Sequence, residues 1–181
     1  MSDDETQSAA GSSPQGSWRL FVPADVPFIY QLVAAVDPRW WRFSRHGLEP
    51  SRLLEIAEGL AAGVVVVDEN GRPVACAVLA DAGSAGTGTL EFYALPDPHA
   101  QAIAARLAPE LVAAAFAGAP IRRLYHERFE NDPDLLGEIS TLFEVEVTFP
   151  DFALVDGGYE SRTTSVTTPE RLAAWQAAGA Q

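Results

Sequence analysis

A short β-like run, a tight loop and a helix form the segment of this sequence best suited to bind a charged ligand. The run Thr89–Leu95 precedes Pro96-Asp97-Pro98, and an alanine-rich helix opens near His99. The N–H groups at a helix N-terminus carry partial positive charge and are a ready site for phosphate. The segment 94–107 therefore predicts a phosphate-binding loop, to which His99 would contribute when it is protonated.

Residues capable of proton transfer stand on two predicted strands. Glu91 and Tyr93 alternate to the same face of the strand before the loop, where a carboxylate could take a proton through water. Tyr125 and His126 lie on the next predicted strand, 121–129, and a histidine titrates near neutral pH. The plainer interpretations stay open: a solvent-facing Glu91 and a packed His126.

One basic, aromatic cluster stands out in an acidic chain. Its members are Arg39, Trp40, Trp41, Arg42, Arg45 and His46. Arginine and tryptophan together suit an anionic or aromatic small molecule, through bidentate contacts and stacking. The alternative is that the two tryptophans fill the edge of the core and that the arginines are solvated.

The remaining reactive side chains limit the chemistry. Cys76 is the single cysteine, which excludes an intrachain disulfide, and its apolar strand predicts a core position. The three histidines, His46, His99 and His126, are scattered and lack ligand spacing, so no metal site is predicted.

Charge and composition exclude several classes of partner. The chain has 181 residues and a net charge of −13, which disfavours nucleic acid and anionic lipid. All 12 of its basic residues are arginine, so chemistry that needs a lysine is excluded. No apolar run reaches the length of a membrane span, and the polar, acidic segment 1–17 resembles a disordered tail rather than a signal peptide. We expect a cytoplasmic protein.

The elements that would position these residues follow from periodicity and turn signals. Strands are predicted at 17–22, 64–67, 74–79, 89–95, 121–129, 144–149 and 159–166. Helices are predicted from Asp25, a plausible N-cap, to Val36, at about 50–62, at about 99–117, from 131 and from Thr168. Asn70-Gly71 indicates a hairpin turn, and Pro109 should kink or split the third helix.

The resulting order, β-α-α-β-β-β-α-β-α-β-β over residues 18–167, resembles that of the GNAT superfamily of N-acetyltransferases. The loop is similar to the coenzyme A loop of that family, with His99 in place of Arg or Gln, Ala102 in place of the first Gly, and Ala104 at the second. The resemblance implies an α/β fold with a mixed, mostly antiparallel central sheet flanked by helices. Residues 1–17 would precede this domain, and a short helix and tail, 168–181, would follow it.

The resemblance also implies a set of site residues. Glu91 would be the general base, assisted by Tyr125 or His126. Acetyl-CoA or another acyl-CoA would contact Ala94, Leu95, His99, Ala100, Ala102 and Ala104. The acceptor would contact Trp40, Trp41, Arg42, Arg45 and Tyr93. The tyrosine that protonates the thiolate in this family has no counterpart, since the stretch 134–142 contains none.

Four further segments resemble small GNAT proteins associated with bacterial natural-product gene clusters. They are 41–45, 66–74, 121–125 and 156–159. The resemblance implies an acyl-CoA-dependent N-acyltransferase acting on a small molecule, as a monomer or homodimer. Two alternatives stay open: a GNAT-fold protein that has lost acetyl-CoA use and transforms a biosynthetic intermediate by cyclisation or decarboxylation, and a noncatalytic binding module.

Overall fold

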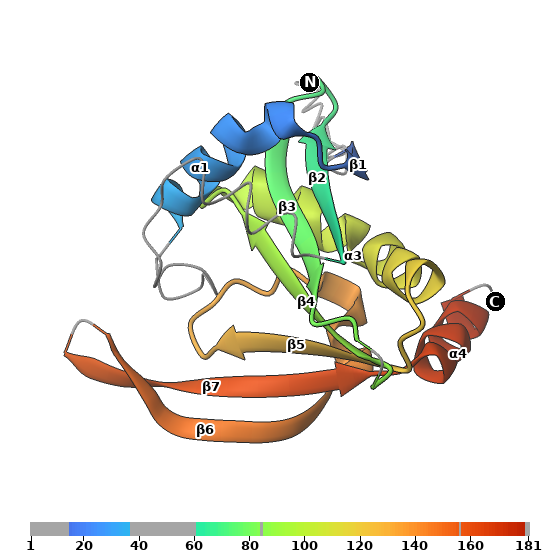
Figure 1. Ribbon diagram of the computed structural model, residues 1–181. Helices are drawn as coiled ribbons and strands as arrows, with labels where there is room; N and C mark the ends of the chain where they lie inside the picture. Colours follow the sequence, from blue (N-terminus) through green and yellow to red (C-terminus); the bar gives the residue numbers. More distant parts are fainter. Residues whose placement is uncertain (1–14, 37–60, 84, 156, 180–181) are drawn as a thin grey trace, which may run out of the picture.

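The computed structural model describes residues 15–36, 61–83, 85–155 and 157–179 (Figure 1). The elements in these ranges are β1 (Gly16–Leu20), η1 (Pro23–Asp25), α1 (Val26–Ala35), β2 (Ala62–Asp68), β3 (Pro73–Ala80), β4 (Thr87–Ala94), α3 (Pro98–Gly118), β5 (Arg123–Phe129), η4 (Gly137–Leu142), β6 (Glu144–Val155), β7 (Gly158–Thr167) and α4 (Pro169–Gly179). The predicted helix at 50–62 lies outside the described residues except at its end, where Ala62 already belongs to β2.

Seven strands form one sheet in the order β1-β2-β3-β4-β5-β7-β6. All neighbouring strands are antiparallel except β4 and β5, which are parallel. In Figure 1, β2, β3 and β4 lie side by side and alternate in direction, and β5, β6 and β7 cross them at a large angle. The predicted α/β fold with a mixed, mostly antiparallel sheet is confirmed.

Helices cover both faces of the first half of the sheet. On one face, α3 packs Ile103 and Leu107, each at most 2 % exposed, against β2–β4 and η4. On the other face, Leu32 and Val36 cover Cys76 and Tyr93. Burying an aliphatic side chain of this size contributes about 1.5–3 kcal/mol, so these two cores hold the helices against the two faces of the sheet.

The long helix α3 is a single element in spite of Pro109. Its seven buried residues include Ala108 and Leu111, which hold the helix against the sheet on both sides of the proline, so the predicted split does not occur. By length and composition alone, α3 would also be able to cross a membrane. Its buried stripe is that of a core helix.

The β2–β3 turn is the predicted hairpin. Gly71 has φ +76°, a conformation that favours glycine. Asp68, 4 % exposed, accepts hydrogen bonds from Asn70 N and Arg72 N, each at 2.9 Å. These bonds, and the guanidinium of Arg72, hold the pKa of Asp68 below its ordinary value.

Other predicted boundaries need correction. The predicted helix from 131 does not form; Asp132 accepts from Phe129 N in a turn, and the 3-10 helix η4 begins only at Gly137. Asp25 is the N-cap of α1, but its carboxylate makes no cap bond and binds Arg19 at 2.6 and 2.7 Å instead.

Both ends of the described chain pack into the domain, although the sequence analysis placed them outside it. Strand β1 begins at Gly16, inside the segment expected to be a tail, and pairs with β2. At the other end, α4 buries Leu172 in the α3 core, and Trp175 packs beside it. The chain terminus thus contributes to the same core as the sheet.

Candidate functional site

The candidate site lies where β4 and β5 separate. These parallel strands pair at only three positions, the last being Thr89 with Tyr125, although β4 continues to Ala94 and β5 to Phe129. In Figure 1 the two strands meet near their starts and diverge toward their ends. Beyond Thr89, no strand in the described part of the chain pairs with this edge of β4.

Backbone groups of β4 face the divergence. Leu95 N donates to Val74 O at 2.9 Å, so the backbone of Leu95 points to β3. Because successive residues of a strand point their N–H and C=O groups to opposite neighbours, Phe92 and Ala94 point theirs toward β5. Leu95 N thus already has a partner, and the backbone groups that face β5 beside the predicted contact are those of Ala94 and Phe92. Only the strand register reveals this, because no side-chain pattern marks it.

Glu91 and Tyr93 lie together on the face of the sheet covered by α1. Tyr93 Oη donates to Glu91 Oε2 at 2.7 Å, and the tyrosine is 6 % exposed. Tyr93 packs with Leu32 and Val36 of α1. The phenol thereby fixes the orientation of the Glu91 carboxylate, two residues beyond the last residue of β4 that pairs with β5. Tyr125, partly buried, stands on the same face by its pairing with Thr89.

His126 stands on the opposite face. Its ring contacts Phe143 edge-on, with the centroids 6.0 Å apart, and Phe143 belongs to the α3 core. His126 Nδ1 lies 3.1 Å from Leu90 O, so the Nδ1–H tautomer donates to that carbonyl. Burial lowers the pKa of His126, which favours the neutral ring. The structure therefore does not bring His126 together with Glu91. The histidine instead binds the carbonyl of Leu90, just beyond the last paired residues of β4 and β5.

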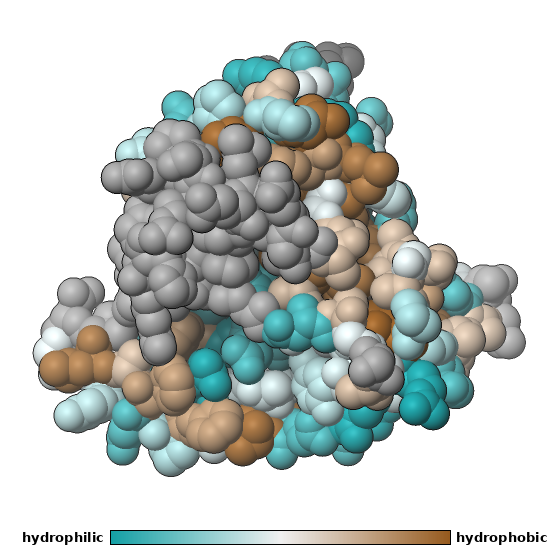
Figure 2. Space-filling model, viewed as in Figure 1, coloured by the Kyte–Doolittle hydropathy of each residue, from teal (hydrophilic) through white to brown (hydrophobic). Residues whose placement is uncertain are grey.

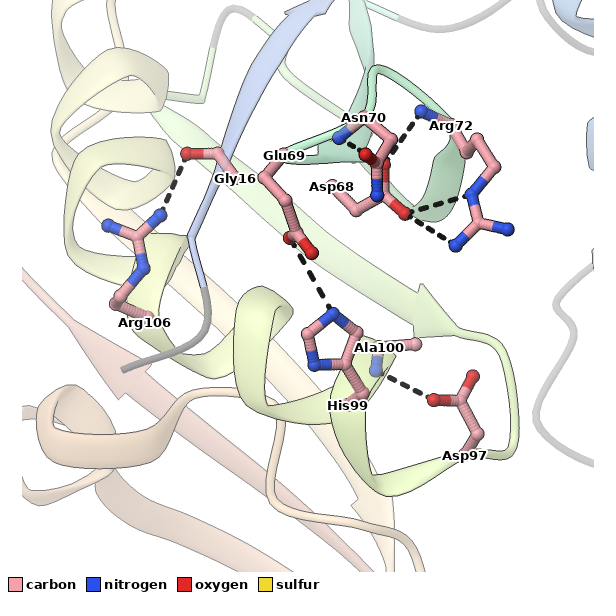
Figure 3. A network of polar contacts seen from close by, with 9 residues as sticks. All are labelled: Gly16, Asp68, Glu69, Asn70, Arg72, Asp97, His99, Ala100 and Arg106. Atoms are coloured by element: carbon pink, nitrogen blue, oxygen red, sulfur yellow. Dashed lines mark hydrogen bonds and ion pairs between the residues drawn. The ribbon is translucent and has the colours of Figure 1, made fainter. Parts of the chain in front are cut away.

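The N-terminus of α3 is capped by its own chain (Figure 3). Pro98 has no N–H, Ala100 N donates to Asp97 Oδ1 at 3.0 Å, and Gln101 N donates to Asp97 O. His99 Nε2 lies 3.7 Å from Glu69 Oε2. A carboxylate thus occupies the position that suits a phosphate, and a second one pairs with the histidine.

The alanines of the predicted loop lie inside α3. The helix begins at Pro98, so the N–H groups of Ala102 and Ala104 come after the first four positions, which are the ones left without helical partners. Ala100 and Ala104 are fully buried in the core, and Ala102 is exposed. The N–H groups of Ala102 and Ala104 therefore form no preformed binding site for the phosphates of coenzyme A.

Some predicted site residues cannot be placed. Trp40, Trp41, Arg42 and Arg45 lie outside the described residues. In the segment expected to carry a thiolate-protonating tyrosine, Thr141 Oγ1 donates to Glu138 O. Among the described residues, no group of three or more metal-ligating side chains is suited to hold an ion.

Glu127 is a candidate that the sequence did not single out. It lies two residues beyond Tyr125, as Glu91 lies two beyond Thr89, so both carboxylates stand on the same face on either side of the divergence. Its side chain is 44 % exposed and pairs loosely with Arg162, Oε2 to Nη1 at 3.5 Å.

Solved structures share this architecture. A protein assigned as a phosphinothricin N-acetyltransferase matches with TM-score 0.66 and 19 % identity, covering 85 % of this chain and 98 % of that one. The spermidine N-acetyltransferase from Vibrio cholerae, in complex with CoA and spermine, matches with TM-score 0.72 and 14 % identity, covering 88 % and 98 %. No protein-family model and no curated protein matches in sequence. The structural likenesses show that this chain has the GNAT fold.

Proposed function

We propose that this chain is an acyl-CoA-dependent N-acyltransferase that acts on a small-molecule amine. The observation that carries the proposal is the divergence of β4 and β5 after Thr89 and Tyr125, with Glu91 on one face beside it. The divergence leaves backbone groups of β4 without a strand partner among the described residues, and a ligand that extends between two strands, as a pantetheine chain can, would pair with them. The GNAT fold supports the same conclusion.

Each residue at the divergence has a chemical task. Glu91 receives the proton that the amine loses, and Tyr93 holds that carboxylate in one orientation. The N–H groups of Phe92 and Ala94 are directed to where a carbonyl oxygen gains charge as the carbon–nitrogen bond forms. Coenzyme A, when bound, would supply the acyl group as an activated thioester; its carbon–sulfur bond breaks as the carbon–nitrogen bond forms, and the leaving thiolate takes a proton from solvent. His126 takes no part and stays with Leu90.

The residues present fit the two ends of coenzyme A unequally. The unpaired edge of β4 suits the pantetheine, because amide groups there lack strand partners among the described residues. The α3 terminus suits the pyrophosphate less well, because Asp97 fills the helix cap and Glu69 pairs with His99. We therefore expect the affinity for coenzyme A to be modest.

Further features of the reaction belong to the same proposal. The donor is acetyl-CoA or another acyl-CoA, and the acceptor is anionic or aromatic, with contacts from Trp40, Trp41, Arg42, Arg45 and Tyr93. The two structural neighbours are named for small molecules acylated on nitrogen, which supports an acceptor of that size. The resemblance to small GNAT proteins supports a role in natural-product metabolism. From the composition we also expect a cytoplasmic protein, as a monomer or homodimer.

Calorimetry with acetyl-CoA, followed by a screen of amines for thiol release, tests the proposal. Binding in the micromolar to millimolar range and turnover with at least one amine are expected. Glu91→Gln should lower kcat by about 100-fold or more, because general base catalysis is lost. The control is Glu110→Gln. Glu110 belongs to α3, and its carboxylate accepts a hydrogen bond from Trp18 Nε1, so this variant should keep the wild-type kcat. Turnover that survives in Glu91→Gln would show that the base is wrongly assigned.

The capped α3 terminus favours a second candidate. If neither the wild-type protein nor Asp97→Ser binds acetyl-CoA, the fold has lost this donor and binds or transforms another intermediate. The same calorimetry therefore separates the two candidates.

A further inference from the structure

The half of the sheet beyond the divergence carries a cluster of aromatic side chains around one arginine. Arg162 of β7 pairs in register with Phe129 of β5 on one side and with Phe149 of β6 on the other. Directly paired residues point to the same face, and Phe129 lies two residues beyond Glu127. The cluster therefore occupies the same face of the sheet as Glu91 and Glu127, and it begins two residues beyond Glu127 on β5.

The guanidinium of Arg162 lies over two aromatic rings. The centre of its guanidinium lies 4.1 Å from the centroid of Phe152 and 5.3 Å from that of Phe149. Phe152 in turn lies 5.9 Å from Phe129. A guanidinium over aromatic rings is attracted to their faces and keeps its N–H groups for hydrogen bonds.

The aromatic surface is unusually exposed. Phe149 is 39 % and Phe152 is 42 % exposed, while Arg162 between them is 27 % exposed. Figure 2 shows apolar groups along the lower left of the molecule, over the β6–β7 hairpin. Exposed apolar patches on one face of a small domain usually mark a place where another molecule binds.

The charge of Arg162 is only weakly compensated. Its contact with Glu127 is long, at 3.5 Å, and among the described residues none accepts a hydrogen bond from its buried Nε. A guanidinium has five N–H donors and pairs with a carboxylate through two parallel hydrogen bonds. This position thus offers a cation and two aromatic rings to one ligand.

From this geometry we infer that Arg162, Phe149 and Phe152 form the acceptor subsite, which binds a carboxylate carried beside an aromatic ring. The inference rests on the proposed function, because it places the ammonium of the same ligand between Glu91 and Glu127. The acceptor is then an aromatic amino acid or a similar amino carboxylate. Its carboxylate displaces Glu127 from Arg162, and Glu127 becomes available to the ammonium.

Titration with phenylalanine and phenylalaninamide, followed by NMR, tests the inference. Both probes are used at about pH 6, where each keeps a protonated amine, so that they differ only in the carboxylate. The amide is then a cation, which an acidic protein would otherwise prefer. We expect phenylalanine to bind the wild-type protein about tenfold more tightly than the amide, because a charge-assisted pair is lost with the carboxylate. Arg162→Gln should abolish this preference.

Arg123→Gln is the matched control. Arg123 stands on the same face, 5.5 Å from the ring of Tyr125, and pairs with Glu146, but at the start of β5. This variant should keep the wild-type preference. If Arg162→Gln fails to fold, Phe152→Leu, which removes the ring and keeps an apolar side chain, should weaken phenylalanine binding instead.

Equal binding of the two probes, a preference that survives in Arg162→Gln, or no saturable binding of phenylalanine to the wild-type protein would each overturn the subsite. Calorimetry with coenzyme A on the same samples keeps the two proposals apart. If the protein does not bind coenzyme A but still prefers phenylalanine to the amide, the acyltransferase proposal is wrong and the Arg162 subsite is supported.

Discussion

His126 illustrates how one side chain supports the divergence of two strands. Pairing of β4 with β5 ends at Thr89 and Tyr125, and the next carbonyl, that of Leu90, accepts from the ring of His126 instead of from a backbone N–H. A buried carbonyl left without a donor would cost about 1–3 kcal/mol. The ring of His126 therefore supplies the hydrogen-bond donor that Leu90 O would otherwise lack at the point where the strands separate.

Stability should depend on pH through His126. Burial lowers its pKa below the ordinary 6.5, so the unfolded chain binds the proton first as the pH falls. The contribution is then fully present above pH 6.5 and is lost progressively below it. Asp25 and Asp68, whose pKa values are lowered from 3.8, lose their contributions only in stronger acid. We expect Tm to fall between about pH 7 and about pH 5.

The variant His126→Asn retains a donor for Leu90 O but cannot titrate, so its Tm should be flat over that interval. His99→Gln, which alters a 52 % exposed side chain, should keep the wild-type slope. Thermal unfolding followed by circular dichroism at several pH values measures this. An unchanged slope in His126→Asn would place the pH dependence elsewhere.

Cys76 should be inert while the protein is folded. The thiol is 2 % exposed, and burial, together with the charge of Glu91, raises its pKa to about 12. A thiolate is the reactive form, so a thiol reagent such as Ellman's should react only after denaturation. Rapid reaction of the native protein would contradict the packing of Cys76 beneath α1.

At the scale of elements, the α3 terminus decides whether a phosphate can bind. Asp97→Ser keeps a cap for Ala100 N and removes a negative charge from the helix end. We expect the affinity for coenzyme A to rise by about fivefold. The control Glu170→Gln changes an acidic residue in the first turn of α4 and should have no effect. Calorimetry on the two variants compares them directly, and equal affinities would mean that Asp97 does not oppose the cofactor.

The contact of β1 with α3 depends on a glycine. A Cβ at Gly16 would come within 2.5 Å of Val67 O and 2.6 Å of Ile103 Cγ2. Gly16→Ala should therefore lower the free energy of unfolding by about 1–3 kcal/mol. Gly118→Ala, where a Cβ would meet nothing within 4 Å, should leave stability unchanged or raise it by at most about 1 kcal/mol. Urea denaturation measures both, and equal effects would contradict the close packing of β1.

At the scale of the whole molecule, a net charge of −13 opposes the compact state. Added salt should screen this repulsion more than it weakens partly buried pairs such as Arg19 with Asp25. We expect the free energy of unfolding to rise, by about 1 kcal/mol or less, between low and moderate concentrations of sodium chloride. A fall would mean that ion pairs outweigh the repulsion.

Local patterns in the sequence determined most of the fold. The alternating strands, the Asn70-Gly71 turn and the apolar stripe of α3 depend on neighbours in the chain, and most of these elements lie within a few residues of their predicted ends. The exception is β6, whose predicted end is at 149 and which continues to Val155. The predicted proximity of Glu91 and Tyr93 is confirmed by their hydrogen bond, because alternation alone puts them on one face.

Tertiary structure decided the rest, because it depends on pairing between distant segments. The register of β4 on β5 ends the pairing at Thr89 and turns His126 away from Glu91. The packing of the β2–β3 turn against α3 brings Glu69 to His99. The cross-strand register of β5, β7 and β6 assembles Arg162 with the phenylalanines, which are far apart in the chain. Local sequence patterns do not predict these contacts, because each contact joins residues of different elements.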